Sequence, residues 1–359
     1  MTPDREVVAL HPNEPMAPYA FEVHHRIRRD VRDDYARTAQ SMEHCAAVVA
    51  LQFEEGVWGG EDGDWVLDFT ESLRLPTVVT FHTVHPKPTP RQREIVQTLA
   101  AGAESTVGLS RSAADVLTGV YGIDPARLEV IPYGVPDLPI MAAETIKPTV
   151  ELAGRDVIVA FGLLGRDKGF EVLIEALPAI VADHPRATLV IVGATHPDVR
   201  LRDGETYRDS LKARVAALKL GSHVRFVPEF VGRVELARWL QAADVVVSPS
   251  LDRERTGSGT LAHAMGAGRA IVATRSPVSQ ELLADRHGIV VSPTPAAIAA
   301  AIHRLLKDPA LRAELGDRAH ERSRPMAWTR VGAEYQRLFA LAGGRRKSGA
   351  GTAVVPAWG

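Results

Sequence analysis

Short apolar runs alternate with longer segments of mixed polarity along most of the chain. In the first half, the runs that predict strands are Val7–Leu10, Ala46–Leu51, Pro76–Phe81, Ser105–Leu109 and Leu128–Ile131. Between them, segments such as Arg91–Ala101 and Arg111–Tyr121 have helical spacing. Because strands that are apolar throughout are buried on both faces, this alternation predicts βαβ units around a parallel sheet.

The second half repeats the alternation. Its predicted strands are Asp156–Phe161, Ala187–Val192, His223–Val227, Asp244–Ser248, Ala270–Thr274 and Gly288–Val291. Its predicted helices are Gly169–His184, Tyr207–Leu218, Val234–Ala242 and Ser258–Ala267. The fold class is therefore α/β, with two doubly wound, Rossmann-like domains.

The segment Pro132–Ala153 breaks this pattern, because it contains prolines at 132, 136, 139 and 148 and has no clear period. We predict an N-terminal domain over residues 1–135, a linker over 136–153 and a C-terminal domain over 154–327. The Gly-rich, basic residues 343–359 predict a flexible tail. Parallel sheets bind ligands beyond the carboxyl ends of their strands, so a cleft between the two domains is the expected site.

Composition narrows the class of protein. The chain has 359 residues, 42 Lys and Arg against 44 Asp and Glu, and a net charge of −2, which argues against a nucleic-acid partner. A single cysteine, Cys45, excludes an intrachain disulfide and a Cys-based zinc site. The first residues do not form a signal peptide, and no stretch approaches the ~20 apolar residues of a membrane span. These features predict a cytoplasmic protein.

The basic run His24–Arg32 is most often a solvated helix face. A peripheral contact with a membrane, or with an anionic acceptor, is the less favoured interpretation of this run. The thirteen histidines show no metal-ligand spacing, so we predict no metal site and no bound cofactor.

The most informative loop runs from Phe161 to Phe170 and reads FGLLGRDKGF. It follows a predicted strand, contains Gly165, Arg166 and Lys168, and precedes a predicted helix. Helix N-termini carry unpaired N–H groups and about half a positive charge, so these cations indicate a diphosphate site. On spacing alone, an ordinary turn with solvated cations is an equal alternative.

A second loop of this kind, residues 251–260, reads LDRERTGSGT and precedes a predicted helix. Thr256 or Ser258 can cap that helix. Residues 257–262 also match the G-x-G-x-x-A dinucleotide pattern, but weakly, because the loop is charged and no acidic residue follows the next strand. A phosphate site for a ligand other than a dinucleotide is the better interpretation.

In the first half, the strand ending at Phe81 is followed by His82, which could bind a ligand or stabilise charge at the sheet edge. Alone, a structural histidine is the more common explanation. The loop of residues 56–64 also follows a strand and contains Gly59, Gly60 and Glu61. Its position favours the cleft modestly over a plain surface turn.

Together these segments resemble glycosyltransferase family 4, which has the GT-B architecture. The resemblance covers nearly the whole chain and rests on segments 77–82, 130–135, 168–176, 243–249 and 264–274 and on Trp328. It implies that the C-terminal domain binds a nucleotide-diphosphate sugar, that the N-terminal domain binds the acceptor, and that a last helix, residues 328–342, returns to the N-terminal domain. It also implies metal-independent transfer with retention of anomeric configuration.

The chain departs from the family pattern in three places. The arginine expected before Lys168 is absent, and Arg166 is the candidate substitute. The family's pair of glutamates falls on Arg255 and His263, with Glu254 one residue away. The family's first strand, Gly-rich loop and helix have no counterpart. We therefore expect that either the given sequence starts late or the N-terminal domain lacks its first βα unit.

The resemblance assigns candidate roles to particular residues. His82 and Glu254 are the candidate catalytic residues, and the loop of Gly59, Gly60 and Glu61 is assigned to the acceptor side. The candidate donor-binding residues are Gly165, Arg166, Lys168, Ser258, Gly259, Thr260 and His263. The amides of Gly259 and Thr260 are expected to bind the diphosphate, unless Ser258 only caps the helix and His263 packs beneath it.

The predicted function is a retaining glycosyltransferase that moves a hexose from a nucleotide-diphosphate sugar to a glycan, lipid or small-molecule acceptor. Two alternatives remain: a degenerate, non-catalytic member that binds a nucleotide sugar or a partner, and a GT-B sugar phosphorylase. An NAD-dependent oxidoreductase is a distant third.

Overall fold

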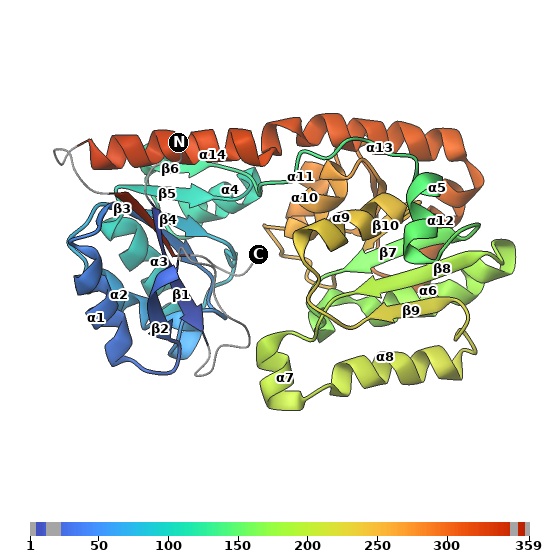
Figure 1. The fold of residues 1–359 in the computed structure, drawn as a ribbon, viewed down its shortest axis with the longest axis horizontal. Coiled ribbons are helices and arrows are strands. Elements are labelled where there is room, and N and C mark those ends of the chain that lie inside the picture. The colour runs from blue at the N-terminus through green and yellow to red at the C-terminus, as the bar shows by residue number, and fades with distance from the viewer. Residues whose placement is uncertain (1–4, 12–22, 345–350, 356–359) are drawn as a thin grey trace. The chain divides into compact units, whose positions relative to one another are not determined.

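The computed structural model describes residues 5–11, 23–344 and 351–355. These residues divide into two compact units (Figure 1). Unit 1 contains residues 1–132, 255–257 and 329–359, and unit 2 contains residues 133–254 and 258–328.

Unit 1 is built on a parallel sheet with the strand order β2-β1-β13-β3-β4-β5-β6. The strands are β1 (Arg5–His11), β2 (Val23–Arg28), β3 (Ala46–Phe53), β4 (Thr77–Phe81), β5 (Ser105–Gly108), β6 (Leu128–Val130) and β13 (Gly351–Val355). The helices are α1 (Asp33–Met42), α2 (Val66–Glu71), α3 (Pro90–Gly102), α4 (Arg111–Gly119) and α14 (Trp328–Gly343), with 3-10 turns η1 (Glu61–Gly63) and η2 (Pro125–Arg127).

Alternate residues of these strands face different layers, as the period of a strand requires. Val49 and Val79 join the core beneath α1, α2, α3 and α4. Val48 and Val78 face the other way and pack with Val331 and Leu338 of α14. Both faces of the sheet are therefore covered, which explains why its central strands are largely apolar.

Unit 2 has a second parallel sheet, in the order β12-β11-β10-β7-β8-β9. Its strands are β7 (Asp156–Phe161), β8 (Ala187–Val192), β9 (Val224–Val227), β10 (Val245–Ser248), β11 (Ala270–Thr274) and β12 (Ile289–Val291). One face packs against a layer that includes α6, α8 and α12, and the other against a layer that includes α9, α10 and α11.

The helices of unit 2 are α5 (Ala143–Ile146), α6 (Phe170–Asp183), α7 (Pro197–Asp203), α8 (Thr206–Ala217), α9 (Arg233–Ala242), α10 (Gly259–Gly266), α11 (Pro277–Leu282), α12 (Pro295–Lys307) and α13 (Pro309–Ser323). Its 3-10 turns are η3 (Lys147–Val150), η4 (Arg166–Lys168) and η5 (Arg324–Met326).

The Pro-rich segment differs from the linker that the sequence predicts over residues 136–153. It contains α5 and η3 and belongs to unit 2. The Lys147 side chain is only 1% exposed, and its Nζ lies 2.7 Å from Oδ2 of the buried Asp244. A buried ion pair of this kind anchors the segment, because breaking it would leave an uncompensated charge in the core.

The basic run His24–Arg32 also differs from the helix face that the sequence predicts. Its residues 24–28 belong to the edge strand β2, in which Ile27 is buried and Arg26 and Arg28 are exposed. Charged residues on an edge strand oppose pairing with another chain. The prediction failed because β2 is short and mostly polar. Its buried residue Ile27 is too little to produce an apolar pattern typical of a strand.

The C-terminal residues supply a strand in place of part of the predicted flexible tail. β13 lies between β1 and β3 and pairs in parallel with both, for example Ala353 with Glu6 and Val49. The other tail residues, 345–350 and 356–359, lie outside the described residues. Local sequence patterns do not predict this strand pairing, because the paired residues are far apart in the sequence.

Candidate functional site

The Gly-rich loop of unit 2 leaves β7 at Phe161 and is tied to the end of β8. The Gly162 N–H donates to the Val192 carbonyl at 3.0 Å, and the Leu164 N–H donates to the Ala194 carbonyl at 2.9 Å. Leu164 is fully buried, so the loop has an apolar anchor as well. The loop therefore has a defined path at the carboxyl edge of the sheet.

The loop enters α6 at Gly169, where only glycine fits. Its φ is +70°, a conformation that other residues rarely adopt. A Cβ at this position would lie 2.1 Å from the Pro249 carbonyl oxygen, in the loop after β10. This contact explains the Lys-Gly dipeptide at the start of the helix.

The two candidate cations, Arg166 and Lys168, lie in η4 just before that helix. The Lys168 Nζ is 2.8 Å from Oδ2 of Asp167, whose side chain is 56% exposed. An ion pair with so exposed a partner contributes little to stability. An anion at the start of α6 could therefore recruit the Lys168 charge at small cost.

The second predicted loop of unit 2 ends at the N-terminus of α10, where Ser258 is the N-cap. Its Oγ accepts the Leu261 N–H at 3.2 Å. Helix geometry gives the N–H groups of Gly259 and Thr260 no acceptor inside the helix. The two loops meet here, because a Cβ built on Gly162 would lie 3.8 Å from the Thr260 Oγ1.

His263 lies one turn further along α10. Its Nδ1 is 2.9 Å from the Gly259 carbonyl oxygen, and burial holds its pKa below the usual value. A neutral ring can donate its Nδ1–H to that carbonyl. Ser258 thus caps the helix and His263 contacts its first turn, and whether either also binds the donor stays a prediction.

Glu254, the candidate carboxylate of the same loop, is exposed. Its N–H donates to Oδ1 of Asp252 at 3.0 Å, which forms a tight turn. Nothing in unit 2 assigns its side chain a role at the reacting sugar, so that role also stays a prediction.

In unit 1, His82 continues the β4 ladder, and its N–H donates to the Phe53 carbonyl at 3.0 Å. The His82 Nε2 lies 2.8 Å from the Gln52 Oε1. Burial lowers the pKa of the His82 ring to about 4, so the ring is neutral near pH 7. A neutral imidazole can accept or donate a hydrogen bond, but it cannot offer a positive charge.

Two carboxylates after β3 join His82 at the carboxyl edge of the sheet. The Thr83 hydroxyl donates to Glu54 at 2.8 Å, and the His85 Nε2 lies 3.2 Å from Oε2 of Glu55. Burial raises the pKa of Glu54. No sequence motif singles out these glutamates, although their place directly after a strand is the signal that could have found them.

The glycines of the predicted acceptor-side loop serve close packing. Gly59 is buried, its N–H donates to the Tyr35 hydroxyl at 2.8 Å, and a Cβ on it would lie 2.1 Å from the Arg29 carbonyl oxygen. Gly60 has a φ of +86°, and Glu61 is exposed at the start of η1. This packing explains the two glycines, and contact with an acceptor remains a prediction.

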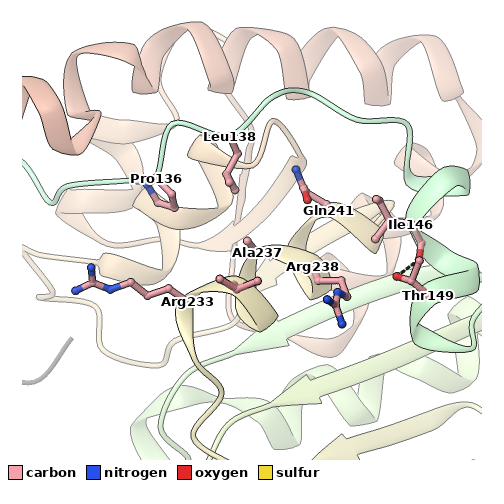
Figure 2. Close-up of a pocket in the computed structure, with 9 residues that line it drawn as sticks. Pro136, Leu138, Ile146, Thr149, Arg233, Ala237, Arg238 and Gln241 are labelled. Atoms are coloured by element: carbon pink, nitrogen blue, oxygen red, sulfur yellow. Dashed lines mark hydrogen bonds between the residues drawn. The ribbon is translucent and has the colours of Figure 1, made fainter. Parts of the chain in front are cut away.

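A separate pocket of about 380 Å³ lies between α5, α9 and the Pro-rich segment of unit 2 (Figure 2). Its lining is Pro136, Leu138, Ile146, Thr149, Arg233, Val234, Ala237, Arg238 and Gln241. None of the candidate site residues is among them, so we do not place the chemistry there.

The described residues contain neither a group of metal ligands nor a membrane-spanning helix. Within residues 5–11, 23–344 and 351–355, His, Cys, Asp and Glu do not gather in groups of three that could hold a metal ion. In the same part of the chain, every helix is too short or too polar to cross a membrane.

Comparisons with known proteins place both units in one group of enzymes. Residues 155–308 match the family model described as glycosyl transferases group 1, and residues 63–137 match the model described as glycosyltransferase family 4.

Two named relatives are similar in sequence. A D-inositol 3-phosphate glycosyltransferase from Pseudarthrobacter chlorophenolicus is 30% identical over 74% of this chain and 65% of its own length. A phosphatidyl-myo-inositol mannosyltransferase from Mycolicibacterium smegmatis is 32% identical over 60% of this chain and 52% of its own. The chain thus spans between about half and two-thirds of the length of these relatives.

Solved structures with low sequence identity share the fold. Sucrose-phosphate synthase from Thermosynechococcus elongatus has a TM-score of 0.73 at 20% identity and covers 93% of this chain and 89% of its own. Anabaena HepE in complex with UDP and glucose also has a TM-score of 0.73, at 15% identity, and covers 94% of this chain and 99% of its own.

Proposed function

The chain belongs to glycosyltransferase family 4 and has a GT-B fold, and we propose that it transfers a hexose from a nucleotide-diphosphate sugar to an acceptor with retention at the anomeric carbon. The observation that carries this proposal is the meeting of the two glycine-containing loops in unit 2. There the N-terminus of α10 and the start of α6 with Lys168 lie at the same sheet edge.

The leaving diphosphate is the group that most needs stabilisation during such a transfer. Two kinds of group can supply positive potential here. They are the helix N–H groups of Gly259 and Thr260, and the ammonium group of Lys168. They can offset the developing negative charge without side-chain carboxylates at positions 255 and 263. Arg166 is exposed beside Lys168 and is the candidate second cation.

The acceptor side is assigned to unit 1. We assign His82 to the reacting sugar and the neighbouring carboxylates Glu54 and Glu55 to acceptor hydroxyl groups. The Glu54 carboxyl has a raised pKa because it is buried, which suits a group that binds or receives a hydroxyl proton. Relatives named for inositol phosphate and phosphatidyl-inositol make these polyols the first acceptors to try.

A second function is favoured by the residues that occupy the family's glutamate positions. Arg255 donates to the Gly257 carbonyl at 2.9 Å, and the His263 ring lies 2.9 Å from the Gly259 carbonyl. Neither side chain can replace a carboxylate. A member of the family that binds a nucleotide sugar without turning it over is therefore the alternative.

The test incubates the chain with a panel of nucleotide-diphosphate sugars and with inositol phosphate, and follows the products by NMR. A product with the anomeric configuration of the donor supports the proposal. Inversion or phosphate-dependent release of the sugar contradicts it, and tight nucleotide binding without any product supports the binding protein. His82→Ala should lower turnover far more than donor affinity, since an interaction made mainly in the transition state changes kcat and leaves ground-state binding alone.

A further inference from the structure

A row of hydrogen-bonded polar side chains leads from α14 to His82 inside unit 1. Gln52 and Thr80 are paired residues of β3 and β4. They lie on the sheet face that also carries Val48 and Val78, which is the face covered by α14. The Tyr335 hydroxyl of α14 lies 3.0 Å from the Thr80 Oγ1. The pleat therefore aligns polar positions that are scattered in the sequence.

In the structure, the amide nitrogen of Gln52 faces Thr80 and the amide oxygen faces His82. Its Nε2 donates to the Thr80 Oγ1 at 3.3 Å, and its Oε1 lies 2.8 Å from the His82 Nε2. A carbonyl oxygen can only accept a hydrogen bond. In this arrangement the His82 Nε2 must carry the proton.

The surroundings of Gln52, Thr80, His82 and Tyr335, which we call the relay, keep His82 and Tyr335 in their neutral forms. Thr80 is fully buried, and burial lowers the pKa of His82 to about 4 and raises that of Tyr335 to about 12. Near pH 7 the imidazole thus has one ring proton, and Tyr335 keeps its hydroxyl proton. With the proton on Nε2, the lone pair is on Nδ1.

We propose that Gln52 is a positioning residue that holds His82 as the Nε2–H tautomer, with Thr80 and Tyr335 fixing the amide of Gln52. The Nδ1 atom is then the ring atom that can accept a hydrogen bond from a sugar hydroxyl. That consequence for turnover rests on the proposed function, whereas the tautomer does not.

The alternative arrangement reverses the amide of Gln52. The Thr80 hydroxyl would then donate to Oε1, the amide nitrogen would donate to the His82 Nε2, and the ring would carry its proton on Nδ1. The two arrangements place the same heavy atoms at the same distances, so only a measurement of the proton position separates them.

The experiment records long-range ¹H–¹⁵N NMR spectra of the whole chain with ¹⁵N-labelled histidine at pH 7, and assigns His82 by its loss in His82→Gln. We expect the pattern of an Nε2–H ring. Gln52→Met removes the acceptor at similar size, and should lower the ratio of Nε2–H to Nδ1–H by roughly 2- to 10-fold, the range that one hydrogen bond spans. Tyr335→Phe should shift it in the same direction by less.

The control is Gln97→Met, which removes an exposed glutamine that donates to the Tyr121 carbonyl elsewhere in unit 1. It should leave the His82 spectrum unchanged. An Nδ1–H pattern in the native chain, or native His82 spectra in both Gln52→Met and Tyr335→Phe, would overturn the proposal. No substrate is needed, so a failure here is distinct from a failure of the proposed function.

Discussion

At the scale of single residues, the cations beside the start of α6 provide the most direct test of the donor site. Lys168→Ala should weaken nucleoside-diphosphate binding by ~1.5–3 kcal/mol, or roughly 10- to 150-fold in Kd, because it removes one charge-assisted contact. Calorimetric titration measures this. Arg166→Ala should act in the same direction if Arg166 replaces the family's missing arginine.

Lys212→Ala is the matched control, since Lys212 is exposed on α8 and pairs only loosely with Asp209, at 3.5 Å. It should bind nucleotide as the native chain does. Native affinity in both Lys168→Ala and Arg166→Ala would place the phosphates elsewhere.

The pKa of His82 makes a second prediction, about stability against pH. Burial lowers this pKa from 6.5 to about 4. The unfolded chain therefore binds a proton below pH 6.5 that the folded chain does not, so stability is full above pH 6.5 and falls as the pH falls toward 4. Between pH 7 and pH 5 the native chain should lose about 2 kcal/mol more than His82→Asn.

Urea unfolding of both proteins at the two pH values measures this difference. Other histidines with a lowered pKa, such as His184 and His320, contribute equally to the pH dependence of both proteins, so the difference cancels their contribution. Equal losses would show that the pKa of His82 is not lowered in the folded protein, so that the ring is charged at pH 5.

At the scale of elements, the turn from the Gly-rich loop into α6 depends on Gly169. Gly169→Ala forces a Cβ into a left-handed conformation and to within 2.1 Å of the Pro249 carbonyl oxygen. We expect a loss of ~1–3 kcal/mol in the free energy of unfolding, together with weaker nucleotide binding. Denaturant titration and calorimetry give the two values.

Gly332→Ala is the opposite case, because Gly332 lies inside α14 and a Cβ there meets no atom within 4 Å. This change should stabilise the protein by ~0.5–1 kcal/mol. A Gly169→Ala variant as stable as the native chain would mean that the loop has another conformation.

The strand β13 makes a prediction for the sheet of unit 1. A chain that ends at residue 344 lacks β13 and leaves the facing edges of β1 and β3 unpaired. We expect a lower Tm and faster amide exchange in β1 and β3, whereas a chain that ends at residue 355 keeps the strand and should match the full chain. Unchanged exchange in β1 and β3 after the longer deletion would contradict the pairing.

At the scale of the whole molecule, the division of labour between the units can be tested without an acceptor. A nucleoside diphosphate at 100 times its Kd should add ~2.7 kcal/mol of stability. The first protection in hydrogen exchange should appear in unit 2, over residues 162–169 and 259–263. The matching nucleoside without phosphates is the control and should protect less. Protection confined to residues 52–55 and 82–85 would reverse the assignment of the units.

Much of this architecture follows from local sequence patterns. Runs such as Ala187–Val192 are apolar at all but one position, Thr188, because strands buried on both faces carry few polar side chains, so they could be found without a structure. Gly169 before α6 is likewise visible in the sequence, because its left-handed backbone conformation and its close contact with Pro249 demand glycine. Pattern and family resemblance together pointed to the two loops that we propose as the donor site.

Other features depend on contacts between residues that are distant in the sequence. The place of β13 in the sheet, the burial of Lys147 against Asp244 and the relay from Tyr335 to His82 all join such segments. Local periodicity reports which face of an element is buried, but it does not report the partner. The sequence by itself determined the two α/β sheets and their loops, and only the tertiary structure decided which polar groups meet, because a hydrogen bond or ion pair requires both partners in space.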